Sequence, residues 1–334
     1  MMGGGIVSVA RSRWGRALLK TALAAVVIVF AFRALGGYGH TLAGRLEHVR
    51  LGWLAVAFVL SIVYRVVNAF GWTLVLRALG QRLDPIAGAR MWLVSETLRW
   101  LPGSVWSMFS RVTQATRAGV PAILASLSLP LELSLTIGAW LATAGVGLAA
   151  SGAPGAWATQ VPMPWVVGFA AGLFAVVAGG VAIVRWAPSL AISRKVRGLR
   201  GALGELQGSR LRVGWLFATA TLFTALCVFN GVAFQTVIRA VSDVSPGWAA
   251  TIGINAAGWL VGFFAFFAPA GVGVREGGMT AMLAPLMPVD AALVAVLLWR
   301  VVQIAVEGVC LAACFAPAGV SAIRRLLDGA WAEI

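Results

Sequence analysis

Charged side chains stand inside several apolar stretches of this 334-residue chain. An ionisable group within a membrane span costs about 2.5–3.5 kcal/mol by insertion scales, so each is a functional candidate. Four of five such groups contain arginine, whose planar fork matches a phosphate in bidentate geometry. The pattern predicts a buried site for an anionic headgroup, with a lipid phosphate as the natural ligand. The groups are Arg65; Glu96, Arg99 and Arg111; Glu132; Arg275 and Glu276; and Arg300 and Glu307.

Two of these groups surround a proline that is followed by glycine. Proline ends a helix and glycine lets backbone approach closely, so each element should break a helix. A break at membrane depth is tolerated only inside protein or beside a wet cavity, and new helix ends offer N–H groups to an anion. An ordinary interfacial loop is the alternative for the first element. The elements are LRWLPGSVWSMFSR, with Pro102 and Gly103, and PAGVGVREGG, with Pro269, Gly271 and Gly273.

The isolated charges each have a structural alternative. Arg65 lies in mid-span with Asn68 on the same face, and a hydrogen bond to a neighbouring helix would explain it equally well. Glu132 follows Pro130, and we expect it to pair with an arginine of another helix. A structural ion pair and a proton or substrate site are both open for it.

The remaining charges are spaced for pairing or for a shared helix face. Glu96 and Arg99 are three residues apart and could form an ion pair. Arg300 and Glu307 are seven residues apart, or two helical turns, so they should share one face with Gln303 near it. Such a polar stripe on an apolar helix should look into the bundle.

The elements that must position these charges are membrane helices. Hydrophobic residues make up 60% of the chain and charged residues only 11%, against about 25% charged in soluble domains. We predict an all-α, polytopic transmembrane bundle of seven to eight spans, taking about 20 residues for each crossing. One domain, 17–318, lies between a basic N-terminus at 1–16 and a tail at 319–334. Seven spans are placed near 17–36, 51–79, 120–149, 164–186, 213–238, 247–268 and 289–318, with broken segments at 88–115 and 269–288.

The distribution of basic residues predicts the orientation. The interval 187–212 holds six basic residues against one acid, so it should be cytoplasmic, as should the N-terminus. The uncharged interval 150–163 should face outward, and Arg324 and Arg325 pull the tail inward. Because seven crossings cannot place both ends inside, a broken segment would complete an eighth. The net charge of +15 arises from basic residues at the ends of the apolar segments, as expected for a protein of a bacterial-type cytoplasmic membrane. Nucleic acid is therefore not an expected partner.

A weak internal repeat is visible around the two prolines. Pro102 and Pro121 are 19 residues apart, as are Pro269 and Pro288. Each pair brackets a broken segment that leads into a long apolar helix. Coincidence is the alternative, but interrupted helices in matching positions are the best sequence indication of a transporter binding site.

Catalysis and cofactors are not expected. The three cysteines lie in apolar runs without histidine or carboxylate at metal-ligand spacing, so they are interpreted as small buried residues. No nucleophile–base set and no GxxxxGK[ST] element appears, so neither an enzyme nor direct ATP use is predicted. Coupling to protons or ions through Glu132, Glu276 or Glu307 stays open.

The two proline elements resemble the signatures of a known family. LRWLPGSVWSMFSR is similar to an LPG element followed by arginine, and PAGVGVREGG to a PGGxGxRE element. Both belong to the lysylphosphatidylglycerol synthase transmembrane-region family, also called flippase-like proteins. The resemblance assigns motif positions to Leu101, Pro102, Gly103, Arg111, Pro269, Gly271, Gly273, Arg275 and Glu276. Ala270 departs from a usual glycine, and Ser104 from a usual basic or amide residue that could contact a headgroup.

The resemblance implies a membrane domain that moves or handles lipids. In the multiple peptide resistance factors, this domain accompanies a cytosolic aminoacyl-transferase domain and flips aminoacylated phosphatidylglycerol. This chain is not expected to make lysyl-lipid itself. The expected function is translocation of an anionic, aminoacylated or glycosylated phospholipid or polyprenyl-phosphate lipid. The alternative is a non-transporting accessory subunit of a lipid-modifying or glycosyltransferase system. Membrane lipids are the expected partners, with such an enzyme as a further partner.

Overall fold

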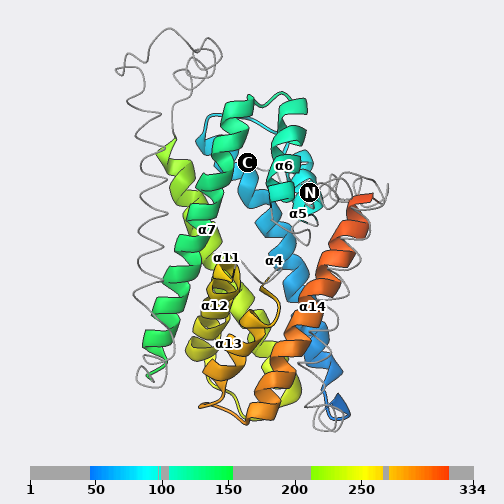
Figure 1. Cartoon of the computed structure of the whole chain (residues 1–334), viewed down its shortest axis with the longest axis vertical. Coiled ribbons are helices and arrows are strands. Elements are labelled where there is room, and N and C mark those ends of the chain that lie inside the picture. The colour runs from blue at the N-terminus through cyan, green and yellow to red at the C-terminus, as the bar shows by residue number, and fades with distance from the viewer. Residues whose placement is uncertain (1–45, 97, 99–104, 153–211, 266–270, 316–334) are drawn as a thin grey trace, which may run out of the picture.

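The described part of the chain is helical throughout. The computed structural model describes residues 46–96, 98, 105–152, 212–265 and 271–315, and these contain no strand. The predicted all-α class is therefore confirmed (Figure 1). The helices are α4 (Leu51–Ala78), α5 (Pro85–Glu96), α6 (Val105–Arg117), α7 (Ala122–Ala150), α11 (Val213–Val241), α12 (Trp248–Phe264), α13 (Val274–Leu283) and α14 (Val289–Phe315).

Four of the described helices are long and apolar enough to cross a membrane, namely α4, α7, α11 and α14. They coincide with four predicted spans, and the protein is an integral membrane protein. The predicted span at 247–268 corresponds to α12, which has only 17 residues. The predicted spans 17–36 and 164–186 lie outside the described residues, as do the orientation intervals apart from residues 150–152 and Arg212.

Both broken segments contain short helices, as the proline and glycine residues predict. The first segment holds α5 and α6, and the second holds α13. Gly271 and Gly273, just before α13, have φ angles of 68° and 85°. Side chains other than glycine rarely adopt such angles, so this turn depends on these two residues.

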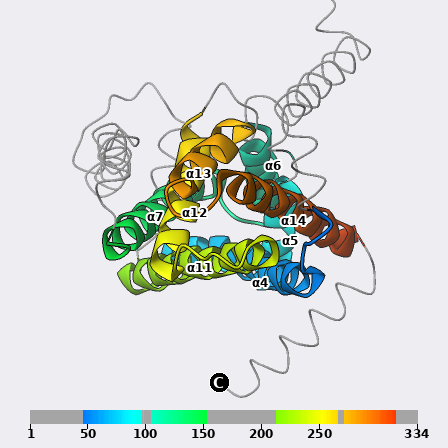
Figure 2. The same ribbon diagram turned by 90° about the horizontal axis from the view of Figure 1, so that it is seen from below.

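The helices pack into one bundle in which α4 lies along α11. Figure 2 shows α4 and α11 side by side, with α12, α13 and α14 across from them. The short helices α5 and α6 lie toward one end of the bundle and α13 toward the other (Figure 1). The two broken segments are therefore at different depths.

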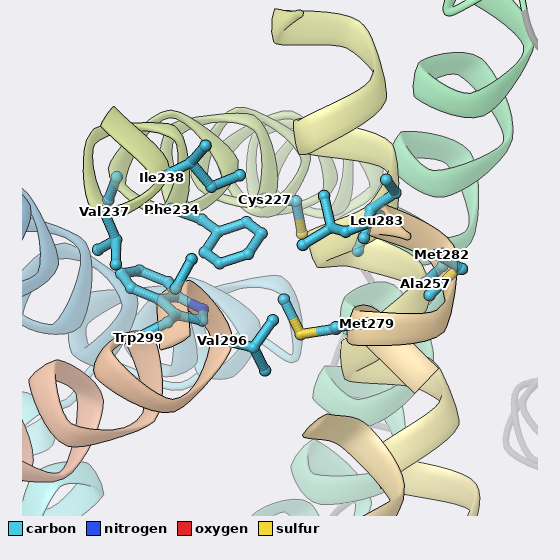
Figure 3. Close-up of a cluster of buried hydrophobic side chains, with 14 of the residues drawn as sticks. Cys227, Phe234, Val237, Ile238, Ala257, Met279, Met282, Leu283, Val296 and Trp299 are labelled. Carbon is cyan, nitrogen blue, oxygen red and sulfur yellow. The ribbon is translucent and has the colours of Figure 1, made fainter. Parts of the chain in front are cut away.

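Buried apolar side chains fix α13 and α14 against α11 and α12. Phe234 of α11 packs on Trp299 of α14, with ring centroids 5.6 Å apart. Met279 of α13 is fully buried and lies near Val296 of α14 (Figure 3). Gly258 of α12 faces the Met279 side chain so closely that an added Cβ would lie 2.2 Å from it. This core holds the start of α13 against the middle of α14, where Arg300 lies.

Candidate functional site

The first group of buried charges gathers around Arg111. Its guanidinium group donates from Nη1 to Glu132 Oε2 at 2.5 Å, from Nη2 to Glu96 Oε1 at 2.8 Å and from Nε to Ser95 Oγ at 3.0 Å. The Arg111 side chain is only 6% exposed. Each of the three guanidinium nitrogens therefore donates to a protein acceptor. We call Arg65, Trp92, Glu96, Arg111, Glu132 and Glu307 the carboxylate cluster.

Trp92 is the apolar centre of the carboxylate cluster. Its indole N–H donates to Glu132 Oε1 at 2.7 Å. The guanidinium groups of Arg65 and Arg111 lie over its ring at 5.2 and 5.5 Å from the centroid. Cation–π attraction is strongest where water is excluded, as it is here. One tryptophan thus orients a carboxylate and two arginines together.

Arg65 connects the carboxylate cluster to α14. Its Nη2 lies 3.2 Å from Glu307 Oε1, and both side chains are about one-tenth exposed. The cluster joins five helices, α4, α5, α6, α7 and α14. Buried ion pairs add little net stability, but removing one partner is costly because a bare charge remains. The chemistry of this cluster therefore favours fixing helix positions.

The second group of charges lines a recess between α13 and α14. We call its lining residues the arginine pocket. Glu276 accepts the backbone N–H of Gly273 with Oε2 at 2.7 Å, and its Oε1 lies 3.5 Å from Arg300 Nε. Glu276 thereby satisfies the start of α13, where acidic side chains are favourable. The lining residues are Arg275, Glu276, Met279, Val296, Trp299, Arg300 and Gln303.

Gln303 brings an unused donor to the arginine pocket. Its side-chain nitrogen is buried and has no hydrogen-bond partner among the described residues. A buried amide without a partner costs about 1–3 kcal/mol. In this conformation the recess is too narrow to admit a water molecule. The pocket thus has donor capacity that the described protein groups do not use.

Close backbone contacts explain the glycine-rich sequence before the arginine pocket. A Cβ on Gly271 would lie 2.7 Å from the backbone of Gly262 in α12. A Cβ on Gly262 would lie 2.9 Å from the Cβ of Arg275. Only glycine at both positions lets the turn pass α12 and bring Arg275 to the recess.

A chain of neutral hydrogen bonds supports the arginine pocket from behind. The indole N–H of Trp299 donates to Asn255 Oδ1 at 3.1 Å, and Asn255 Nδ2 donates to Asn230 Oδ1 at 2.9 Å. Both asparagines are buried. Because buried polar groups are costly unless paired, this chain fixes α11, α12 and α14 relative to one another.

The model of one protein family matches most of the chain. Residues 17–309 match the lysylphosphatidylglycerol synthase TM region. The chain belongs to this family. No curated protein matches the chain. The match agrees with the resemblance carried by the two proline elements and supports a role connected with membrane lipids.

The predicted site residues of this family member fall into two places. Glu132 pairs with an arginine of another helix, as predicted, and that arginine is Arg111. Arg300 and Glu307 share α14, yet Arg300 belongs to the arginine pocket and Glu307 to the carboxylate cluster. Arg275 and Glu276 lie at the start of α13, as expected. Arg99, Pro102, Gly103 and Pro269 lie outside the described residues.

Charge alone did not identify several residues that complete the site. Trp92, Ser95 and Trp299 hold their charged or polar neighbours, and none was predicted. The available signal was that a buried indole N–H needs an acceptor. The same need applies to Trp72, whose indole N–H donates to Ser128 Oγ at 2.9 Å. With 15 tryptophans in the chain, that signal does not select the right ones.

Proposed function

We propose that this protein is a flippase-like transporter. Its cargo would be an anionic, aminoacylated or glycosylated phospholipid or a polyprenyl-phosphate lipid, moved without chemical change. The observation that carries the proposal is the arginine pocket, where Arg275 and Arg300 face a recess with Glu276 as the carboxylate among its described lining residues. The family match supports a lipid as the ligand.

A phosphate suits the unused hydrogen-bonding capacity of the arginine pocket. Glu276 is partly neutralised by its bond from the Gly273 N–H and by Arg300. A phosphate oxygen near Gln303 would accept from the amide nitrogen that lacks a partner among the described residues. Charge-assisted hydrogen bonds to phosphate are about twice as strong as neutral ones. A bound phosphate would thus add charge-assisted hydrogen bonds at this site.

The carboxylate cluster has a different role in this proposal. Because the Arg111 fork is occupied by Ser95, Glu96 and Glu132, the cluster holds α5, α6 and α7 around α14. We place the protein in a bacterial-type cytoplasmic membrane with its N-terminus in the cytoplasm. Membrane lipids are the proposed partners, and a lipid-modifying enzyme or glycosyltransferase is the proposed protein partner.

Binding of phosphatidylglycerol to the protein in detergent micelles tests the proposed site. Arg275→Gln and Arg300→Gln should each abolish binding while the protein still folds. Arg117→Gln is the matched control, because it removes one positive charge from an exposed position at the end of α6. Phosphatidylcholine, with no net charge, should bind weakly to all. Unchanged phosphatidylglycerol binding in both pocket variants would refute the site.

A non-transporting accessory subunit is the second candidate function. The ion pairs of Arg111 with Glu96 and Glu132 favour it, because a purely structural network needs no ligand. A reconstituted transfer assay with fluorescent lipids separates the two functions. Absence of transfer for phosphatidylglycerol, its aminoacyl forms and polyprenyl phosphates alike would favour the accessory function.

A further inference from the structure

The contacts between α4 and α11 are reciprocal. The guanidinium group of Arg77 in α4 lies 5.3 Å from the ring centroid of Trp215 in α11. The guanidinium group of Arg239 in α11 lies 5.4 Å from the ring centroid of Trp53 in α4. The two tryptophans, Trp53 and Trp215, are 162 positions apart in the sequence, and so are the two arginines, Arg77 and Arg239. Residue i contacting j while j contacts i is the mark of a two-fold axis.

The backbone repeats the same reciprocity at both ends of the pair. The Arg212 N–H donates to the Ala78 carbonyl at 2.8 Å, and the Arg50 N–H donates to the Ala240 carbonyl at 3.0 Å. Arg50 and Arg212 are again 162 positions apart, as are Ala78 and Ala240. Sequence identity follows the same register in Gly-Trp-Leu at 52–54 and 214–216, in Asn68 and Asn230, and in Arg-Ala at 77–78 and 239–240.

The whole helix arrangement obeys this two-fold relation. When α4, α5, α6 and α7 are matched with α11, α12, α13 and α14, every substantial contact between described helices has its counterpart. Because the start of each central helix lies at the end of the other, the two halves run in opposite directions, as the colours of Figure 1 show. The described chain is therefore an inverted repeat, an architecture of secondary transporters.

One pair of equivalent contacts is unequal. Helix α12 packs on α7 far more extensively than α5 packs on α14. Trp140 and Trp259 stack with centroids 5.1 Å apart and planes within 9°. A Cβ on Gly147 would lie 2.7 Å from the backbone of Gly253. The α7–α12 contact is thus sealed by aromatic stacking and direct backbone packing.

The position on α14 that is equivalent to Trp140 carries a charge. Pro121 and Pro288 precede α7 and α14, and in their register Trp140 corresponds to Glu307. Glu307 pairs with Arg65 of the carboxylate cluster instead of stacking on a ring. The α7–α12 contact is therefore closed by apolar packing, while Glu307 on α14 pairs with Arg65 of α4 at the equivalent place.

We propose that the two halves exchange these arrangements, so that α5 closes on α14 when α12 separates from α7. The exchange exposes the charged residues of α14, Arg300 and Glu307, to one side of the membrane and then to the other. It also opens the arginine pocket, which in the present conformation is too narrow for a ligand. Only the identity of the cargo rests on the proposed function.

Two spin-label pairs measure the exchange in the full chain reconstituted in lipid, with Cys227, Cys310 and Cys314 replaced by alanine. The first pair, Val146→Cys and Trp248→Cys, reports the α7–α12 contact. The second pair, Ala313→Cys and Ala87→Cys, reports the α5–α14 contact: Ala313 is equivalent to Val146 in the register of the prolines, and Ala87 follows the equivalent of Trp248 by one residue. Val146, Trp248 and Ala313 are exposed, and Trp53 keeps a ring over Arg239 when Trp248 is replaced.

A wedge variant shifts the equilibrium, and a neighbouring glycine provides its control. Gly147→Leu must part α7 from α12, because its Cβ would meet backbone atoms at 2.7 Å. Gly145→Leu makes the same change on the same helix, where no described atom lies within 4 Å of the added Cβ. We expect Gly147→Leu to lengthen the 146–248 distance and shorten the 87–313 distance, and Gly145→Leu to change neither.

A lengthened 146–248 distance with an unchanged 87–313 distance would overturn the exchange, as would a wedge that moves neither. Misfolding would broaden both distributions and shorten neither, which also counts against the proposal. Lipid transfer measured on the same samples separates the two ideas. Coupled distances without transfer would leave the exchange standing and refute the cargo. Lipid transfer without coupled distances would support the cargo and refute the exchange.

Discussion

The two charged regions on α14 use arginine in different ways. In the carboxylate cluster, Arg111 spends its Nε and both Nη groups on protein oxygens. In the arginine pocket, Gln303 keeps a buried donor without a partner among the described residues. A charge within a membrane protein therefore does not by itself identify a ligand site. The difference lies in the partners of the arginines: Arg111 donates to three protein oxygens, whereas Arg300 Nε lies 3.5 Å from Glu276 Oε1.

Removing Arg111 should have the largest effect on stability. Arg111→Met leaves Glu96 and Glu132 buried without their shared counter-ion, and losing one partner of a buried pair costs about 3–5 kcal/mol. We expect a loss of this size in the free energy of unfolding, measured by denaturant titration in detergent. Arg300→Met should cost less, because Glu276 keeps its bond from the Gly273 N–H. Equal losses would erase the distinction between the two regions.

Changing Arg300 should have the largest effect on anion binding. Arg300→Lys keeps the positive charge but loses the planar fork, so it tests geometry separately from charge. A hydrogen bond to a charged group is worth about 1.5–3 kcal/mol, or roughly 10–100-fold in Kd. We expect Arg300→Lys to weaken phosphatidylglycerol binding within this range, with Arg300→Gln weaker still in the same titration. Full affinity in the lysine variant would show that charge alone suffices.

The two buried tryptophans give a matched comparison of the regions. Trp92→Phe keeps a ring beneath Arg65 and Arg111 but removes the N–H bond to the charged Glu132. Trp299→Phe removes an N–H bond to the neutral Asn255. The expected losses of unfolding free energy are about 1.5–3 and about 0.5–1.5 kcal/mol. The reverse order would mean that the Trp92–Glu132 bond contributes little.

Gln303 should show the smallest change in stability, with a loss of binding. Gln303→Leu removes a buried donor that costs about 1–3 kcal/mol when unsatisfied. The melting temperature should stay level or rise, while phosphatidylglycerol binding weakens. A fall in stability with unchanged binding would show that the amide serves structure instead.

Much of the fold could be predicted because apolar length and proline position are local signals. The residues of α4, α7, α11 and α14 read directly as spans, and the equal spacing of Pro102–Pro121 and Pro269–Pro288 indicated the repeat. The partners within the site could not be predicted. Arg65 meets Glu307 only because α4 packs on α14, and no local pattern carries that information.

The shared helix face of Arg300 and Glu307 shows the same limit. Helical periodicity placed both residues toward the bundle interior, and that placement is consistent with their ion pairs. It could not show that two turns separate two different environments, one filled by Arg65 and one formed by α13. The reciprocal contacts of α4 and α11 likewise emerge only when both helices are in place.

Transfer of fluorescent phosphatidylglycerol between leaflets of proteoliposomes tests the central claim most directly. Accessibility of the lipid to an impermeant quencher reports the transfer. The wild-type protein and Arg117→Gln should speed transfer above that of protein-free vesicles, and Arg300→Gln should remove this increase. Transfer at the wild-type rate in Arg300→Gln would contradict the account, as would no transfer by the wild-type protein with phosphatidylglycerol, its aminoacyl forms and polyprenyl phosphates.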